Sequence, residues 1–234
     1  DDVMGVIEIL SSRREYTKIN PFVVLLGKGD HQITSSWTAP DGYEHQTMIG
    51  MTCSNVTFVG TGKNITTILG GFGIDNIENI TFKQMTLTNT SDDGCGIDTR
   101  NATKVELMDV AFKGCKYAAL YILSSTSVTT VVATRCEFAN STYGAEIDGS
   151  LTSATFKNCV FHDNTQHGVY GQHQSTIHLH GEATAVHSNR SSGISAWTSC
   201  NVLIHLPSHH NTTYNNGNED RHTIQGGTIT NVED

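Results

Sequence analysis

Acidic and aromatic side chains recur at matching positions of a repeat of about 25 residues. Carboxylates at such positions could act as general acids or bases, and aromatic rings pack well against sugar rings. One set of equivalent positions contains Gly96, Tyr121, Glu146, Tyr170 and Ser195. A second set, two residues later, contains Asp98, Leu123, Asp148, Gln172 and Trp197. We expect both sets to lie on one outward surface.

Short strands with alternating apolar side chains must position these residues. The segment Ile77–Asp98 is the clearest copy of the repeat. Its inward pairs would be Ile80/Phe82, Met85/Leu87 and, after the polar turn Asn89–Gly94, Cys95/Ile97. Because side chains alternate across a strand, these pairs would face a core and their neighbours would face outward. Each repeat is therefore predicted to form three strands.

Apolar residues in like settings mark the period along the chain. They are Ile33, Phe58, Phe82, Leu107, Val132, Phe156, Leu179, Ile204 and Ile229. A unit of this size cannot bury its own apolar face, so successive units must stack. This pattern predicts a β-solenoid.

Several phrases resemble the pectin-lyase-like right-handed parallel β-helix superfamily. They are "ITFKQMTLTN", "CEFANSTYGAEIDG", "CVFHDNTQHGVYG" and, after an amphipathic segment, "VVLLGKGDHQI". The superfamily includes pectate lyases, polygalacturonases, alginate epimerases, phage tailspikes and uncharacterised surface proteins, some of them viral, and the chain looks closest to the last group. The resemblance implies a fold, whereas function varies on one fold. We predict an all-β, right-handed parallel β-helix of about nine coils with a short N-terminal capping α-helix.

Composition predicts one domain over residues 1–234. Its parts would be a cap helix at 1–15, coils at 23–207, and an irregular loop with a last strand at 208–234. The net charge of −9 argues against a nucleic-acid partner, because phosphate contacts need clustered Lys and Arg. No apolar stretch approaches the length of a membrane span, so no membrane insertion is expected. The opening Asp1-Asp2 is compatible with a processed mature chain.

Sequons for N-glycosylation are more frequent than chance predicts. The candidate acceptors are Asn55, Asn64, Asn79, Asn101, Asn189 and Asn211. Two further sequons, at Asn89 and Asn140, fall with Asp163 at one turn position, where stacked polar side chains would satisfy the backbone and leave poor acceptors. The sequons predict a glycoprotein located extracellularly or on a virion surface.

Cys136 and Cys159 occupy equivalent inward positions on adjacent coils. Strand spacing would place their Cα atoms about 4.8 Å apart, which suits either a disulfide or a stacked pair of buried free thiols. Histidines also stack between coils, in the groups His178/His180/His205 and His162/His187. These groups lack a carboxylate partner in register, so we predict no metal site and no cofactor.

The catalytic alternative would use Asp98, Glu146 and Asp148. Asp98 and Asp148 would lie two coils apart, about 9.6 Å, which is nearer the inverting range of glycosidases. Lyases of the resembled superfamily use a basic residue beside the substrate carboxylate, usually with calcium. The nearest basic residue, Arg100, would have only Ser125 and Ser150 in equivalent positions.

We therefore expect a non-catalytic structural or adhesive surface protein whose partners are glycans or neighbouring subunits. The predicted ligand-binding residues are Tyr121, Glu146, Asp148, Tyr170 and Trp197. The alternative is a polysaccharide lyase, C5-epimerase or glycoside hydrolase acting on an acidic polysaccharide, with calcium only in the lyase case. A homo-oligomer or a larger assembly is left open.

Overall fold

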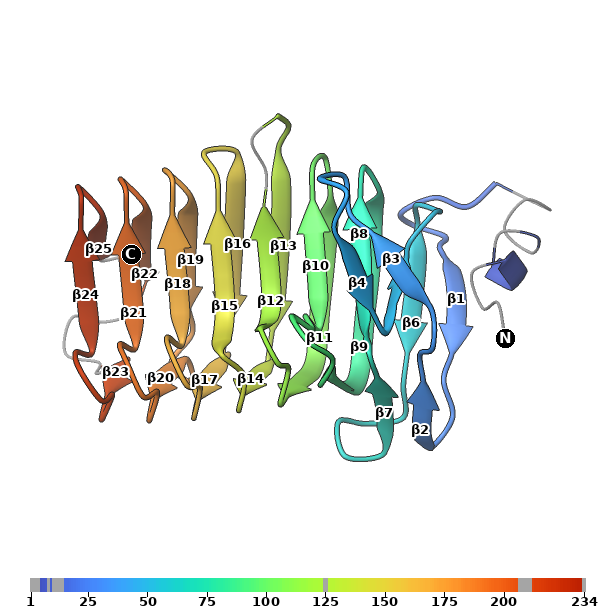
Figure 1. The fold of residues 1–234 in the computed structure, drawn as a ribbon, viewed down its shortest axis with the longest axis horizontal. Coiled ribbons are helices and arrows are strands. Elements are labelled where there is room, and N and C mark those ends of the chain that lie inside the picture. The colour runs from blue at the N-terminus through green and yellow to red at the C-terminus, as the bar shows by residue number, and fades with distance from the viewer. Residues whose placement is uncertain (1–4, 8, 10–14, 124–125, 206–211, 233–234) are drawn as a thin grey trace.

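The computed structural model describes residues 5–7, 9, 15–123, 126–205 and 212–232. Its strands stack side by side along one long axis, with the N-terminal helix at one end and β24 and β25 at the other (Figure 1). Neighbouring strands of successive coils pair in parallel, apart from one antiparallel hairpin. The predicted parallel β-solenoid is confirmed.

Three faces make up the solenoid, and we name them by their order along each coil. The first face contains β1 (Phe22–Leu25), β6 (Val56–Val59), the first halves of β9 (Glu78–Thr88) and β11 (Lys104–Lys113), β13 (Thr129–Thr134), β16 (Thr152–Lys157), β19 (Thr176–His180), β22 (Asn201–His205) and β25 (Thr228–Asn231). The second contains β2 (Gly29–Gln32), β7 (Thr66–Leu69), the second halves of β9 and β11, β14 (Glu137–Ala139), β17 (Val160–His162), β20 (Ala185–His187) and β23 (Thr213–Tyr214).

The third face has eight strands. They are β5 (Met48–Gly50), β8 (Gly71–Asp75), β10 (Ile97–Arg100), β12 (Ala118–Leu123), β15 (Tyr143–Asp148), β18 (Val169–Gln172), β21 (Ile194–Trp197) and β24 (Arg221–Ile224). Seven coils, from β6 to β24, contribute to all three faces in succession among the described strands. Before them β1, β2 and β5 form one more coil, with residues 36–46 inserted between β2 and β5, and after them β25 adds a strand to the first face. The predicted number of coils, about nine, therefore includes these two ends.

The inward residues stack into a continuous apolar core. The rings of Phe112, Phe138 and Phe161 lie parallel on successive coils, with centroids 5.1 and 4.6 Å apart. Each of these side chains is fully buried. Alternation along the strands explains this arrangement, since every second side chain faces the core. The predicted inward pairs Ile80/Phe82 and Met85/Leu87 are confirmed, and so is Ile97. Cys95 is buried instead in a separate small cluster, which packs against Trp37 and three tyrosines.

The period of the first face departs from the prediction at three places. Leu107 pairs with Ala133 rather than Val132, and Ala133 pairs in turn with Phe156. Val132 points outward and is 36% exposed. One extra residue before β13 causes the shift, because a one-residue slip moves a side chain to the opposite face. At the two ends, Phe58 pairs with Val24 rather than Ile33, and Ile229 pairs with Val202 rather than Ile204.

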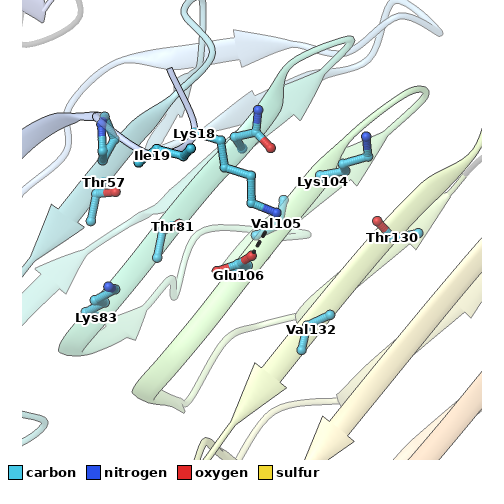
Figure 2. Close-up of a pocket in the computed structure, with 12 residues that line it drawn as sticks. Lys18, Ile19, Thr57, Thr81, Lys83, Lys104, Val105, Glu106, Thr130 and Val132 are labelled. Carbon is cyan, nitrogen blue, oxygen red and sulfur yellow. Dashed lines mark ion pairs between the residues drawn. The ribbon is translucent and has the colours of Figure 1, made fainter. Parts of the chain in front are cut away.

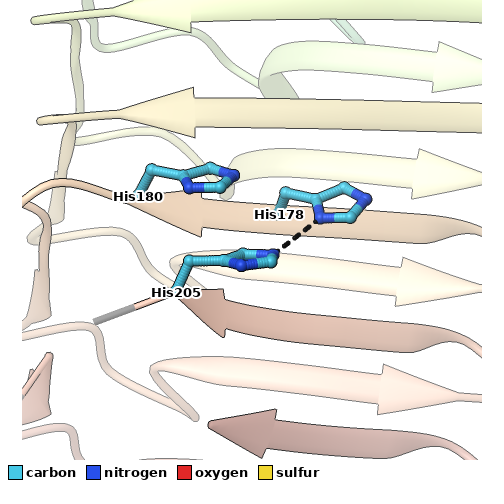
Figure 3. Close-up of side chains that lie close together, drawn as sticks. All are labelled: His178, His180 and His205. Carbon is cyan, nitrogen blue, oxygen red and sulfur yellow. Dashed lines mark hydrogen bonds between the residues drawn. The ribbon is translucent and has the colours of Figure 1, made fainter. Parts of the chain in front are cut away.

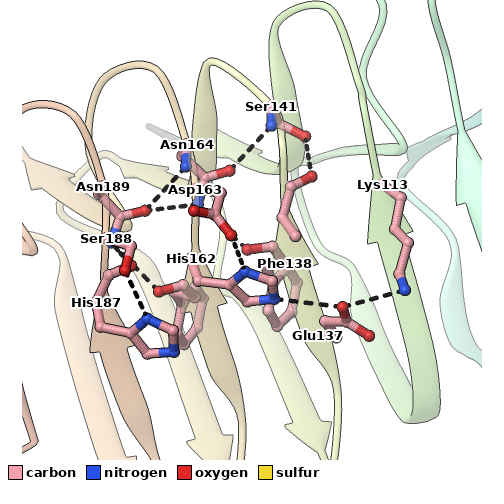
Figure 4. A network of polar contacts seen from close by, with 12 residues as sticks. Lys113, Glu137, Phe138, Ser141, His162, Asp163, Asn164, His187, Ser188 and Asn189 are labelled. Carbon is pink, nitrogen blue, oxygen red and sulfur yellow. Dashed lines mark hydrogen bonds and ion pairs between the residues drawn. The ribbon is translucent and has the colours of Figure 1, made fainter.

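The stacked amides lie one residue later than the sequence predicts. Asn140 and Asp163 have positive φ angles of 55° and 56° and make the turn itself. The ladder is formed by Asn164, Asn189 and Asn216. Asn164 Nδ2 donates to Asn189 Oδ1 at 2.8 Å (Figure 4). Asn189 Nδ2 donates in turn to Asn216 Oδ1 at 2.9 Å. These bonds satisfy buried amide groups in each turn.

The prediction that Asn189 is a glycosylation acceptor is corrected by this ladder. It is 1% exposed, and its Nδ2 also donates to the carbonyls of Phe161 and His187. A glycan on this nitrogen is incompatible with the ladder. Three other candidates, Asn55, Asn79 and Asn101, are half-buried and donate hydrogen bonds, Asn64 is exposed, and Asn211 lies outside the described residues.

Five cysteines are buried free thiols in the described part of the chain, namely Cys95, Cys115, Cys136, Cys159 and Cys200. Cys136 and Cys159 are both buried, and their thiols donate to backbone carbonyls of Thr134 and Ala133. The disulfide candidate is therefore wrong, and the alternative of stacked buried thiols holds. Burial of small apolar thiols needs no covalent link in a core of this size.

The N-terminal end of the chain is helical where the structure describes it, whereas the C-terminal end continues the solenoid. In the predicted cap helix, the described residues 5–7 and 9 are helical, and Ile7 packs into the apolar core. Within 208–234, predicted to be an irregular loop and one strand, β23, β24 and β25 continue all three faces.

The helical residues that the structure describes include no span long and apolar enough to cross a bilayer.

Candidate functional site

A hairpin inserted between β2 and β5 covers the N-terminal part of the third face (Figure 1). Its strands are β3 (Ser36–Thr38) and β4 (Glu44–Gln46). The indole of Trp37 lies against Gly50 and Gly73, where an added Cβ would come within 2.5 and 2.0 Å of the ring. Glycine is needed at both positions because the aromatic ring occupies the space of a side chain.

Asp98 and Arg100 form a sealed ion pair beneath this hairpin. Arg100 donates from Nε and Nη2 to the two Asp98 oxygens, each at 3.0 Å, and its Nη1 contacts Asp41 Oδ2 at 2.6 Å. The His45 ring lies 3.6 Å from Asp98 Oδ2. Asp98 is 0% exposed and Arg100 is 5% exposed. Burial raises the pKa of the Asp98 carboxyl, and the Arg100 hydrogen bonds oppose that rise.

The prediction that Asp98 is an exposed carboxylate available for catalysis is therefore corrected, because Asp98 is buried and paired with Arg100. Its strand is shifted by two residues from the predicted register, so Asp98 pairs with Tyr121 and Arg100 pairs with Leu123. Asp98 and Asp148 are in different ladders, and the separation predicted for an inverting pair does not apply. The turn after Asn89 is longer than its equivalents in the following coils, and sequence alone does not place the extra residues.

The next four coils carry an aromatic strip, which we define as Tyr117, Tyr121, Tyr143, Tyr170 and Trp197. Ring centroids are 5.5 Å apart between Tyr117 and Tyr143, 5.6 Å between Tyr143 and Tyr170, and 6.0 Å between Tyr170 and Trp197. All five side chains are half-buried. The strip is a row of partly accessible rings that spans β12 to β21.

Glu146 lies among these rings and is 4% exposed. Tyr117 donates to its Oε2 at 2.7 Å, and Gln172 Nε2 lies 3.3 Å from its Oε1. Burial raises the pKa of Glu146 to about 7, and the nearby Asp148 adds to the rise while the Tyr117 hydrogen bond opposes it. Glu146 can therefore exchange a proton near neutral pH.

The rim of the strip is polar. Gln172 bridges to Asp148 Oδ2 at 3.1 Å, and His173 Nδ1 lies 2.6 Å from Asp148 Oδ1. Tyr170 donates to Gln172 at 3.0 Å. Hydrogen-bonding groups next to exposed rings are the combination that sugar hydroxyls and sugar faces need.

The structure brings together all five predicted ligand-binding residues on the third face. Tyr121, Glu146 and Tyr170 pair in register as predicted. Sequence reasoning missed Tyr117, Tyr143 and His167, which sit at or just before the start of a strand rather than at its outward alternating positions. The recurrence of an aromatic residue at or shortly before the start of β12, β15 and β18 was the signal that could have found them.

A hollow lies on the outer surface of the first face. It has a volume of about 380 Å³ and is lined by residues of β6, β9, β11 and β13 (Figure 2). Its cations Lys18 and Lys104 pair with Glu106 at 3.7 Å and Glu78 at 3.1 Å. These exposed pairs contribute little energy and leave Lys83 facing the hollow. More aromatic and hydrogen-bonding side chains converge at the aromatic strip than at this hollow, so the strip is the stronger candidate for a binding site.

Comparison with known proteins places the fold in a family. Residues 42–217 match a family described as the right handed beta helix region. The match covers well over half of the chain, so this protein belongs to the right-handed β-helix family. The resemblance drawn from the sequence is thereby confirmed for the fold.

No curated protein matches the chain. Among solved structures, the A-module of mannuronan C-5 epimerase AlgE6 from Azotobacter vinelandii is similar, with 10% identity and a TM-score of 0.35. The alignment covers 99% of this chain and 94% of that module. A likeness at this level carries no argument about activity.

Proposed function

We propose that this protein is a non-catalytic carbohydrate-binding surface protein, located extracellularly or on a virion surface, that holds a glycan chain along the aromatic strip. The observation that carries the proposal is the row of half-buried rings from Tyr117 to Trp197, at spacings of 5.5 to 6.0 Å. Rings presented at coil intervals would contact successive sugar units, and the rigid solenoid would keep them aligned without ordering cost on binding. The sequons support the proposed location.

Charge favours a neutral or amino-sugar glycan. The chain has a net charge of −9, and Glu146 and Asp148 lie within or beside the strip. A polyanionic chain would be repelled, whereas a neutral sugar meets no such penalty. Glu146 and Gln172 would then hydrogen-bond sugar hydroxyls.

The test is a glycan array followed by titration of the best ligand. We expect Tyr170→Ala to weaken the affinity at least about tenfold, because a central aromatic side chain carries a large share of binding energy. The matched control is Tyr214→Ala, which removes a half-buried tyrosine from the second face, stacked on His187. The control should bind within about twofold of the unchanged protein. Failure to bind any glycan, or equal weakening by both variants, would contradict the proposal.

One observation favours a second candidate, an enzyme acting on a polysaccharide. The pKa of Glu146 is raised to about 7, which suits a general acid at neutral pH, and Asp148 is close enough to share Gln172 with it. The array ligands and acidic polysaccharides should therefore be assayed for new reducing ends, unsaturated products and epimerised units. Turnover that is lost in Glu146→Gln would establish the enzyme and overturn the non-catalytic role.

A further inference from the structure

Three histidines gather on the outer surface of the first face, away from the aromatic strip. His178 and His180 are two residues apart on β19, so both side chains point to the same side. His205 on β22 pairs in register with His180. Figure 3 shows the three imidazoles side by side across these two strands. One ring nitrogen from each lies within 4.8 Å of the others.

The spacing of these nitrogens is close to that of a metal site. His178 Nδ1 and His205 Nε2 are 3.0 Å apart and share a hydrogen bond, whose proton a bound metal ion would replace. In a tetrahedral zinc site with Zn–N bonds of about 2.1 Å, neighbouring nitrogens are separated by about 3.4 Å. The His180 ring stacks on His205 with centroids 4.1 Å apart, so the two rings would have to tilt apart for both to direct a nitrogen at one ion. The backbone need not move, because paired strands hold all three residues.

We propose that His178, His180 and His205 bind one late first-row divalent metal ion, with Zn²⁺ as the reference ion and water in the remaining position. Three imidazoles and no carboxylate select zinc, copper or nickel over calcium and magnesium, which prefer oxygen ligands. All three side chains are half-buried, so the ion can reach them while the ladder restrains them. The sequence-based expectation of no metal rested on the missing carboxylate, and three converging imidazoles meet the minimum ligand set without one.

The surroundings of the cluster are compatible with the ion. Thr155 and Leu203 pair with His178 on either side, and both are uncharged. Lys157 on β16 pairs with His180 and is exposed. An exposed lysine side chain can extend into solvent, so it weakens binding of a cation without blocking the site.

A second histidine pair provides an internal control. His162 and His187 stack with centroids 5.4 Å apart on the second face. This pair has only two imidazoles, and His162 is held by Asp163 at 2.6 Å and Glu137 at 3.3 Å (Figure 4). Removing His187 therefore deletes a stacked surface histidine of similar exposure without touching the proposed site.

Co²⁺ titration of the metal-free protein, read by visible absorption, tests the proposal. We expect one equivalent of Co²⁺ to produce d–d bands and one equivalent of Zn²⁺ to abolish them. His178→Ala, His180→Ala and His205→Ala should each reduce the affinity at least about tenfold, and His187→Ala should change it less than about twofold. Thermal melts with and without Zn²⁺ check that each variant is folded and should show ligand stabilisation only where the site is intact.

Three outcomes would overturn the proposal. The first is the absence of binding at stoichiometric protein and metal concentrations. The second is binding that survives all three substitutions. The third is binding that is lost in a His209→Ala/His210→Ala variant but kept in His205→Ala, which would assign the metal to the segment that follows β22. A His178→Gln variant serves if an alanine variant does not fold, because Gln keeps the size of the side chain and removes the imidazole.

Discussion

At the scale of single residues, Glu146 is the carboxyl group that environment changes most clearly within the aromatic strip. It is buried among rings and hydrogen-bonded by Tyr117, and its pKa is raised from 4.5 to about 7. Asp98 is buried more completely, yet its charge is matched by Arg100. A buried carboxyl group with a neutral donor, such as Glu146 with Tyr117, keeps a raised pKa, whereas a cation such as Arg100 opposes the rise for Asp98.

The raised pKa of Glu146 predicts that stability falls as pH rises. The folded state keeps the proton up to about pH 7, whereas the unfolded chain releases it near 4.5, so the contribution is present below 4.5 and is lost through pH 7. Between pH 5 and pH 8 the free energy of unfolding should fall by about 2 kcal/mol more than in Glu146→Gln, which cannot titrate. Urea denaturation of both proteins at the two pH values measures this. Equal pH dependence in the two proteins would contradict it.

At the scale of elements, the β3–β4 hairpin decides which part of the third face is accessible. Trp37 lies on the glycines of β5 and β8, and its ring stacks on His45 at 5.5 Å. Neither His45 nitrogen has a hydrogen-bond partner among the residues that the structure describes. Burial lowers the pKa of His45, which keeps the ring neutral beneath the indole. The hairpin thereby covers the Asp98–Arg100 pair, and the Arg100 guanidinium lies 5.9 Å from the ring centroid of Tyr121 at the edge of the aromatic strip.

Gly73→Ala should displace this hairpin. The new Cβ would lie 2.0 Å from the Trp37 ring, so the indole must move or the strands must separate, at a cost of about 1 to 3 kcal/mol in the free energy of unfolding. Tryptophan emission should shift to longer wavelength as the indole becomes exposed. Gly27→Ala is the matched control, because a Cβ there meets no atom within 4 Å. Unchanged stability and emission in Gly73→Ala would show that the hairpin does not pack in this way.

At the scale of the whole molecule, stability comes from contacts between neighbouring coils. Most of the core contacts join neighbouring coils, and the rings of Phe112, Phe138 and Phe161 join three of them. A residue in the middle of the stack therefore has partners on both sides. A residue at an end has fewer, as the half-buried Phe22 of β1 shows.

This difference predicts unequal costs for one substitution. Phe138→Ala should lower the free energy of unfolding by about 3 to 5 kcal/mol, because it leaves a cavity between two coils. Phe22→Ala removes the same atoms from the first coil and should cost roughly half as much, since that side chain is already part exposed. Chemical denaturation curves of the two variants provide the comparison. A larger loss for Phe22→Ala would place the main stability at the N-terminal end instead.

The sequence was sufficient where coils have equal lengths. From β12 to β21 the spacing hardly changes, so the sequence is enough to place Tyr121, Glu146 and Tyr170 in one ladder. Prediction was wrong where a turn gained or lost residues, as before β13 and before β10. A period counts residues between strands, but it does not say whether an extra residue belongs to the strand or to the turn.

Alternating apolar residues and a period near 25 residues by themselves determined a stacked parallel β-helix, because units of that size must share a core. Tertiary structure alone decided that Asp98 is sealed with Arg100, that Tyr117 and Tyr143 join the strip, and that three histidines converge. The reason is physical. Core periodicity is repeated in every coil, whereas these contacts depend on single turn lengths, an inserted hairpin and the register between strands that are far apart in sequence.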